Sequence, residues 1–300
     1  MNEWTGVSGK YVIITGATSG IGRAAAVQLA ARGARIGIVA RNEAKANEVA
    51  AQLNEVAGGG AVADVFVGDM ASQRSVRQVA SEILERCPRV DVLVNNAGAL
   101  YYHRHLTEDN VEMTWAVNHL APFLLTSLLL DRLKESAPAR VITTSSHGHR
   151  AAREGIDFDD LSGDRLYGRR RLLGGAFGRY AETKLANILF TAELARRLQG
   201  SGVSAYSFDP GLVATNFNKN NGVLVRWNML VMRPFSRSPE KGAETLVWLT
   251  DSADVPESGE IYFADKRSKA PSGAAQDPDA ARRLWEVSEE QTQGSSSLQG

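Results

Sequence analysis

Hydrophobic and polar positions along the chain follow two alternating patterns. Seven short runs are apolar almost throughout, which predicts strands that are buried on both faces. These runs are YVIITG, RIGIVAR, VADVFVGD, DVLVNNAG, RVITTSS, VSAYSFDPG and GEIYFAD. Between them lie longer segments with helical spacing of apolar residues, centred near residues 27, 49, 79, 120, 190 and 246. The alternation predicts an α/β fold: a doubly wound parallel sheet of about seven strands with helices on both faces.

Two longer segments interrupt this alternation. Residues 147–178, here called the insertion, form a long connection, and residues 212–239 form a second one that is unusually apolar for a loop. Both follow the carboxyl ends of predicted strands, where open α/β sheets bind their ligands. Because no Pro- or Gly-rich linker divides the chain, we expect one domain over residues 1–293. The polar residues 294–300 are expected to form a disordered tail.

Composition and charge narrow the classes of partner. Lys plus Arg equals Asp plus Glu at 34 each, so net charge provides no long-range attraction to nucleic acid or anionic lipid. Cys87 is the only cysteine, which excludes an intramolecular disulfide and suits a reducing compartment. The first residues lack the charged and apolar regions of a signal peptide. We therefore expect a cytoplasmic protein without a membrane anchor that does not bind nucleic acid.

The first predicted strand leads into a glycine-rich turn. The segment TGATSGIG places Gly16, Gly20 and Gly22 between this strand and a helix. Glycines here permit a tight turn and close approach of the backbone to a pyrophosphate, which a helix N-terminus stabilises. The alternative is an ordinary strand-to-helix turn. The spacing is G-x-x-x-G-x-G rather than G-x-G-x-x-G, but the strand before the turn and the helix after it favour a dinucleotide site.

The end of the second predicted strand indicates which dinucleotide is bound. It offers Arg41 and no acidic residue before Glu43. An acid at this point would bond the ribose 2′-hydroxyl, whereas an arginine accommodates a 2′-phosphate through charge-assisted bonds. The prediction is therefore NADP(H). The alternative is a solvated arginine at a strand end.

The segment RYAETKLANILF adds a candidate proton donor. Tyr180 and Lys184 lie one turn apart on the same face of a predicted helix. A free tyrosine has a pKa of about 10, which is too high for a base at neutral pH. A nearby ammonium and an oxidised nicotinamide would both favour phenolate, so we expect the pKa of Tyr180 to fall. The pair alone is a weak signal.

Six segments together resemble a known family. TGATSGIG, NNAG, VNHLAPF, VITTSS, YAETK and DPGLVAT occur in the order and approximate spacing of the short-chain dehydrogenase/reductase family. The resemblance covers roughly residues 8–290, and the insertion and the ending ARRLWEVSEE are most similar to the retinol dehydrogenase and WW-domain oxidoreductase-like branch. It implies a Rossmann-type fold and hydride transfer between a nicotinamide and an alcohol or carbonyl. It also implies a homodimer or homotetramer formed through the helices near 107–135 and 179–200.

The same resemblance assigns catalytic roles. Tyr180 would be the general acid/base and Lys184 its electrostatic partner. Ser146 would bond the substrate oxygen, and Asn118 would hold a water that links Lys184 to solvent. Ser145 is the alternative to Ser146, because adjacent strand residues point to opposite faces. The alternative for Asn118 is local bonding within a buried helix.

Expected cofactor contacts extend over several strand ends. Asp69 ends the third strand and Asn95 to Gly98 end the fourth, although each segment is also typical of a turn. In the family's Pro-Gly turn, Pro210 and Gly211 would shape the nicotinamide side. The full expected set is Gly16, Thr18, Ser19, Gly20, Ile21, Gly22, Arg41, Asn42, Asp69, Met70, Asn95, Ala97, Gly98, Tyr180, Lys184, Pro210, Gly211, Val213 and Thr215.

The two long segments bear on the substrate. Residues 212–239 are either a packing helix or a lid over the site, and the resemblance favours a lid that encloses a small lipophilic alcohol, ketone or aldehyde. Membrane-bound retinol dehydrogenases carry an apolar anchor that is not expected here, which puts a retinoid presented from a bilayer in doubt. The Arg- and Asp-rich part of the insertion is expected to be a solvated loop with internal ion pairs, or otherwise to bind an anionic group.

Other site chemistries are less favoured. His147 and His149 lie two residues apart just after Ser146, but no zinc-site spacing accompanies them, so no metal is expected. Two rival functions remain: an epimerase or dehydratase of the same superfamily, and a non-catalytic cofactor-sensing regulator.

Overall fold

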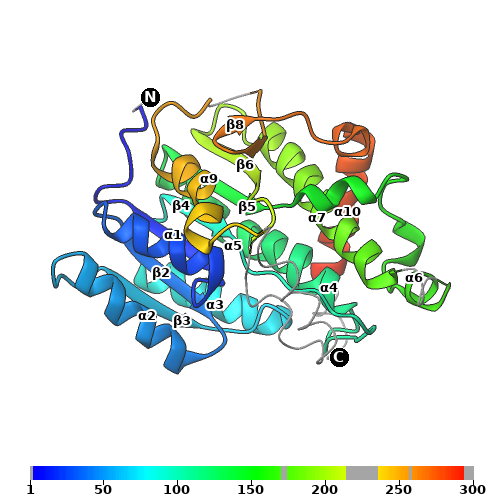
Figure 1. Cartoon of the computed structure of the whole chain (residues 1–300), viewed down its shortest axis with the longest axis horizontal. Coiled ribbons are helices and arrows are strands. Elements are labelled where there is room, and N and C mark those ends of the chain that lie inside the picture. Colours follow the sequence, from blue (N-terminus) through cyan, green and yellow to red (C-terminus); the bar gives the residue numbers. More distant parts are fainter. Residues whose placement is uncertain (1–2, 170–173, 214–235, 257–258, 294–300) are drawn as a thin grey trace.

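A computed structural model of the chain describes residues 3–169, 174–213, 236–256 and 259–293. Its centre is one eight-stranded sheet with the strand order β3-β2-β1-β4-β5-β6-β7-β8 (Figure 1). Strands β1 to β7 pair in parallel, and β8 is antiparallel to β7. The strands are β1 Tyr11–Thr15, β2 Arg35–Ala40, β3 Ala63–Val67, β4 Val92–Asn95, β5 Ala139–Thr144, β6 Val203–Asp209, β7 Tyr262–Ala264 and β8 Arg267–Ser268.

Helices cover both faces of this sheet, as the sequence predicts. One face packs against α1, α2 and α9, and the other against α3, α5 and α7, while α10 packs on α7 (Figure 1). The helices are α1 Gly20–Ala30, α2 Glu43–Val56, α3 Gln73–Arg86, α4 Met113–Trp115, α5 Ala121–Glu135, α6 Asp164–Arg169, α7 Gly175–Arg197, α9 Pro239–Asp251 and α10 Pro278–Gln293. The doubly wound Rossmann-type prediction is therefore confirmed.

All seven predicted strands are present, and the elements that were missed include α6 in the insertion, β8 and α10. Strand β8 contains only two residues, Arg267–Ser268, too few to produce a pattern. Helix α10 is polar over most of its surface, and its buried apolar side chains are Ala281, Leu284 and Trp285. These positions have helical spacing, but this segment entered the sequence analysis only through the family resemblance.

The chain reverses its direction of winding at β1, which lies between β2 and β4. Such a switch point leaves a crevice at the carboxyl ends of the strands, where ligands bind in open α/β sheets. The glycine turn after β1, the NNAG segment after β4, the serines after β5 and the Pro-Gly turn after β6 all lie along this edge.

The stretch 113–135 joins α4 to α5 through a π-helical turn, Ala116–Leu120. By length and composition this stretch could cross a membrane, but 78% of its most apolar window is buried within the fold. Its apolar side chains pack against the sheet, α3 and α7. They are therefore accounted for as core.

Candidate active site

The glycine turn after β1 is built for close backbone approach. Gly16 and Gly20 have φ of +71° and +55°, a region that favours glycine. A Cβ added at Gly22 would lie 2.5 Å from both Gly16 O and Asn96 Nδ2. Only glycine fits at this position. Thr18 lies in the turn, and Ser19 is the N-cap of α1 without a side-chain capping bond.

Asn96, which is not among the expected cofactor contacts, joins this turn to the end of β4. Its Nδ2 donates to Thr15 O at 3.0 Å, while Thr15 Oγ1 accepts the N–H groups of Asn96 and Ala97 at 2.9 and 3.0 Å. The predicted Asn95 points the other way, because its buried Nδ2 donates to Thr126 Oγ1 on α5 at 2.9 Å. The doubled Asn at a strand end was the available signal.

Arg41 lies at the expected adenosine end of the edge. Its guanidinium bonds the phenol of Tyr101, in the loop after β4, and Asp69 acts on the same phenol through its charge. The other predicted residues here have local roles. Asn42 caps α2 by accepting Lys45 N at 2.9 Å, the Asp69 carboxylate accepts Ala71 N at 3.0 Å, and Met70 packs on the core.

Tyr180, Lys184 and Ser146 come together where α7 meets the end of β5. Lys184 Nζ lies 5.5 Å from the centre of the Tyr180 ring and donates to Thr144 O at 3.1 Å. The Ser146 hydroxyl bonds the Tyr180 phenol. A Cβ added at Gly148 would lie 3.4 Å from both Ser146 Oγ and Tyr180 Cε1, so this turn packs directly on the pair.

The two adjacent serines have different partners. Ser145 Oγ is buried and donates to Lys184 O at 2.8 Å, so its hydroxyl is used within the fold. Ser146 is partly exposed and accepts Gly148 N at 3.1 Å while bonding Tyr180. This geometry favours Ser146 as the hydroxyl that meets a substrate.

Asn118 lies in the π-helical turn, and its side chain acts as a clamp. Its Oδ1 accepts Ala99 N at 2.7 Å, and its Nδ2 donates to Ala99 O at 2.9 Å and to Thr183 Oγ1 at 3.1 Å. These partners lie 19 and 65 residues away, so the local-bonding alternative is wrong. The amide joins the loop after β4 to α7, one residue before Lys184.

Comparison with known proteins identifies the family. The sequence profile of short chain dehydrogenases matches residues 10–156. Mouse retinol dehydrogenase 14 is 42% identical over 294 residues, covering 94% of this chain and 85% of that protein. The chain belongs to the short-chain dehydrogenase/reductase family. Within it, the chain is retinol dehydrogenase-like, and family membership makes it an oxidoreductase with a nicotinamide cofactor.

Two further relatives extend the comparison. A Streptomyces sp. (strain C5) protein named as a candidate daunorubicin C-13 ketoreductase, DnrU, is 41% identical, covering 94% of this chain and 92% of its own length. A crystal structure of a protein from Mycobacterium paratuberculosis superposes with a TM-score of 0.72 at 29% identity, covering 97% of this chain and 98% of that one. The similarity to these relatives therefore extends along nearly the whole chain.

The pKa of Tyr180 departs from the prediction for this dehydrogenase-type site. In the protein alone, burial raises the pKa of Tyr180 to about 12, although the bond from Ser146 acts to lower it. We expected Lys184 to lower it, but the cost of desolvating the phenolate outweighs the neighbouring groups. Burial also lowers the pKa of Lys184 to about 8, against the opposing charge of Asp209.

Asp209 is a site residue that the sequence analysis did not select. It ends β6, is buried, and its Oδ1 accepts Gly211 N at 2.9 Å. Its negative charge raises the pKa values of Tyr180 and Lys184. The available signal was an acidic residue immediately before Pro210.

The remaining predicted cofactor residues lie on the same edge. Gly211 has φ of +75°, and a Cβ there would lie 3.0 Å from the Arg237 guanidinium. Val213 pairs with Arg237 and packs over Gly242 of α9, close to Ile21. Thr215 and nearly all of the predicted lid lie outside the described residues, and Gly98 lies in the loop after β4. No group of three or more potential metal ligands occurs among the residues that the structure describes.

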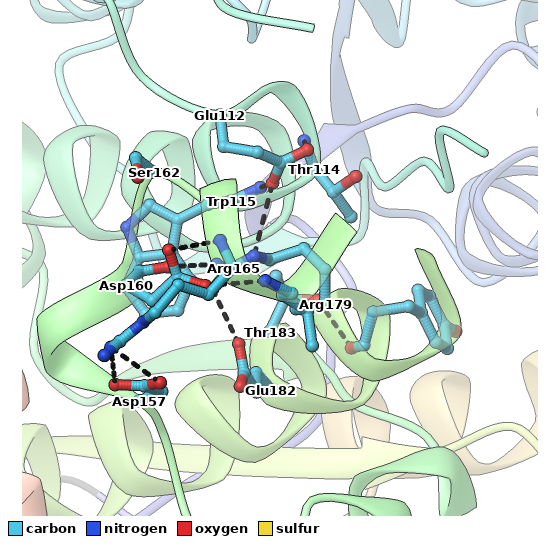
Figure 2. Close-up of polar contacts among 12 residues, drawn as sticks. Glu112, Thr114, Trp115, Asp157, Asp160, Ser162, Arg165, Arg179, Glu182 and Thr183 are labelled. Atoms are coloured by element: carbon cyan, nitrogen blue, oxygen red, sulfur yellow. Dashed lines mark hydrogen bonds and ion pairs between the residues drawn. The ribbon is translucent and has the colours of Figure 1, made fainter. Parts of the chain in front are cut away.

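A buried charge cluster precedes Tyr180 on α7 (Figure 2). The Arg179 guanidinium is completely buried and donates to Glu182 Oε2 at 2.6 Å and to Asp160 O at 2.5 Å. Its Nε lies 3.6 Å from Glu112 Oε2. The cluster thus joins the insertion, α7 and the segment before α4.

The insertion is more ordered than a solvated loop. Asp157 pairs with Arg165 at 3.0 Å on the surface, as expected. In contrast, Asp160 is buried, and its carboxylate accepts the N–H groups of Arg165 and Leu166 at 3.1 and 2.9 Å at the start of α6. The solvated-loop prediction is therefore wrong for this acidic residue, because it caps a helix. Arg170 and Arg171 lie outside the described residues.

Proposed function

We propose that the protein is an NADP(H)-dependent oxidoreductase that interconverts a lipophilic alcohol with its aldehyde or ketone, with Tyr180 as general acid/base. The observation that carries the proposal is the Ser146 hydroxyl bonded to the Tyr180 phenol, with Lys184 beside it, on the edge that holds the glycine turn. The close approach at Gly16 and Gly22 fits a dinucleotide, whose pyrophosphate a Cβ would exclude.

The chemistry follows from the groups present. When bound, the nicotinamide supplies or accepts the hydride. In reduction, the Ser146 hydroxyl donates a hydrogen bond to the carbonyl oxygen and so stabilises the negative charge that develops there. Tyr180 transfers its phenolic proton to the same oxygen. The Lys184 ammonium then stabilises the phenolate that remains.

The preference for NADP(H) rests on Arg41. Its guanidinium follows β2 and bonds the Tyr101 phenol, on which the Asp69 charge also acts. The guanidinium is suited to bidentate bonds with a 2′-phosphate. Arg41→Ala should weaken NADPH binding by roughly 10- to 100-fold and change NADH binding little, in a fluorescence titration. Arg35→Ala, at the opposite end of β2, is the matched control. Equal affinity of the unaltered protein for both cofactors would remove this part of the proposal.

The lipophilic substrate class rests on exposed apolar side chains near the site. Phe177 is 58% exposed and lies three residues before Tyr180, on the same side of α7. Leu212 is 54% exposed and follows the Pro-Gly turn. The names of the relatives, retinol dehydrogenase and daunorubicin ketoreductase, also denote lipophilic alcohols and ketones.

The test is NADPH consumption with a panel that contains retinal, aromatic ketones, steroid ketones and long-chain aldehydes. We expect stoichiometric oxidation of NADPH with at least one carbonyl, and a loss of roughly 10²-fold or more in kcat for Tyr180→Phe. Isomerised or dehydrated product without net NADPH oxidation would indicate the epimerase or dehydratase alternative. Tight NADPH binding without turnover of any compound would indicate the regulator, and normal reduction by Tyr180→Phe would remove the role of this tyrosine.

A further inference from the structure

His149 is a buried histidine that the mechanism above does not use. It lies in the 3-10 turn His147–Ala151, three residues after Ser146, and its side chain is inaccessible to solvent. Both ring nitrogens have main-chain partners. Nδ1 lies 2.7 Å from Ser146 O, and Nε2 lies 3.1 Å from the N of Ser272.

These two partners fix the tautomer. The N–H of Ser272 can only donate, so Nε2 accepts, and the carbonyl of Ser146 can only accept, so Nδ1 carries the proton. The imidazole is therefore neutral, and neither nitrogen is available to exchange a proton with a substrate. His149 must act, if at all, through the groups that it holds.

The charged neighbours favour the same state. Burial lowers the pKa of His149, and the adjacent Arg150 and His147 lower it further. The Asp209 charge and the bond to Ser146 act in the opposite direction. The Tyr262 ring packs edge-on at 5.2 Å, and burial keeps its phenol protonated by raising its pKa.

The bond at Nδ1 acts on the residue that carries the candidate catalytic hydroxyl. Ser146 O accepts both His149 Nδ1–H and the main-chain N–H of His149, at 2.7 and 3.1 Å. Ser146 Oγ in turn accepts Gly148 N at 3.1 Å, and Gly148 packs on the Tyr180 ring. The His149 imidazole thus fixes the short turn from Ser146 to His149, and this turn holds Ser146 next to Tyr180.

The bond at Nε2 connects this turn to a distant part of the chain. Ser272 lies 123 residues later, just after β8. Arg150 strengthens the same connection by donating to Ala270 O at 2.7 Å. The Ser146 turn is therefore anchored on segment 270–272, outside the six family motifs.

We infer that His149 is a positioning residue for the reaction: its Nδ1–H holds the Ser146 carbonyl, and so keeps the Ser146 hydroxyl against the Tyr180 phenol. The inference rests on the proposed function, in which this hydroxyl bonds the reacting oxygen. A hydroxyl that stabilises a developing oxyanion must be held within a few tenths of an ångström, so a loosened turn lowers kcat.

Two amide substitutions separate the two ring nitrogens. His149→Asn can place an N–H where Nδ1–H lies and retains the bond to Ser146, whereas His149→Gln can place an oxygen near Nε2 and retains only the bond to Ser272. We expect His149→Asn to keep kcat within about 5-fold and His149→Gln to lose roughly 30-fold or more, with KM for NADPH unchanged in both. His147→Asn, on the exposed side of the same turn, is the matched control.

A second readout does not depend on turnover. In protein labelled at the tyrosine ring carbons, the Tyr180 NMR signal is assigned by its loss in Tyr180→Phe. His149→Gln should shift this signal and raise the pKa of Tyr180, because the bond from Ser146 that lowers this pKa is lost. His149→Asn should leave the signal in place.

The outcomes distinguish the two claims. If the wild-type protein reduces none of the carbonyl compounds in the panel, the proposed function is contradicted. The NMR experiment then still tests whether His149 positions the Ser146 hydroxyl. If the Asn and Gln variants lose kcat equally and in step with their melting temperatures, or if His149→Gln leaves both kcat and the Tyr180 signal unchanged, His149 is only a packing residue and the inference is overturned.

Discussion

At the scale of single residues, two neighbouring serines after β5 have separate tasks. Ser146→Ala should lower kcat for carbonyl reduction by roughly 10²-fold, because the developing oxyanion loses a donor, with little change in stability. Ser145→Ala should retain most activity and lose about 1 kcal/mol of unfolding free energy, because its buried hydroxyl bonds Lys184 O. Steady-state kinetics and urea unfolding of both variants test this pair, and the opposite pattern would exchange the two assignments.

The buried lysine sets the expected pH dependence. Burial lowers the pKa of Lys184 to about 8, so the ammonium that stabilises the Tyr180 phenolate is lost as pH rises through this value. The pKa of Tyr180, about 12, keeps the phenol protonated over the same range. We therefore expect kcat/KM for reduction to fall above pH 8.

The profile is measured between pH 6 and 10 with NADPH at a saturating concentration. Lys184→Met should give a low rate without this fall, because no group titrates in its place. Lys184→Arg, which stays charged throughout the range, should shift the fall upward if the variant retains activity. A wild-type rate that increases through pH 8 would contradict the assignment.

At the scale of elements, the strands and the edge that they build were predictable, whereas contacts between distant segments were not. Most of the runs that form β1 to β7 are apolar because both faces of the strand are covered, whereas the edge strand β3 is only partly buried. Their carboxyl ends necessarily meet at one edge, which places Ser146 near Tyr180. Helix α10 has a clear amphipathic pattern and could also have been predicted.

Electrostatics was predicted less well than position. The sequence shows that Lys184 lies one turn from Tyr180 but not how completely both groups are buried, so it did not reveal that burial raises the pKa of Tyr180 in the protein alone. His149 was considered only for metal binding, since its partner Ser272 lies 123 residues away. Asp209 affects the pKa values of Tyr180 and Lys184 because β6 brings it beside α7, and the spacing of these residues along the chain does not reveal this.

The buried cluster at the start of α7 gives stability a dependence on pH. Burial raises the pKa of Glu182 to about 7, with the Arg179 charge opposing. The folded protein then binds this proton more tightly than the unfolded chain, so the contribution of Glu182 is greatest below pH 4.5 and is lost as pH rises toward 7. Unfolding free energy should decrease over this window by roughly 1–3 kcal/mol on account of Glu182.

Urea unfolding at several values between pH 5 and 8 tests this claim. Glu182→Gln should remove most of the decrease, because the amide does not titrate. Glu193→Gln, on the same helix, is the control: its arginine partners lower the pKa of Glu193, so its charge does not change in this window. An unchanged slope in Glu182→Gln would show that another group is responsible.

At the scale of the whole molecule, α10 covers part of the apolar surface of α5 and α7. Their apolar content fits the expected homo-oligomer interface, yet Trp285 of α10 covers part of it. Its ring packs edge-on to Phe123 of α5 at 5.0 Å and stacks on Phe190 of α7 at 6.0 Å. His119 Nε2 also bonds Ser288 Oγ at 2.8 Å. These side chains contact one another within a single chain, so their apolar character does not support an interface between chains. The oligomeric state stays a prediction.

The covering role of α10 can be tested by removing its central side chain. Trp285→Ala should lower the unfolding free energy by roughly 3–5 kcal/mol, because a large buried ring is lost and leaves a cavity beside Phe123 and Phe190. The uncovered rings should also promote association that increases with protein concentration in light scattering. Arg282→Ala, on the exposed face of α10, should change neither measurement. Unchanged stability of Trp285→Ala would contradict the covering role of this side chain. If the variant forms smaller particles than the wild type, Trp285 contributes to an interface between chains, because a side chain that only covers its own core does not hold two copies together.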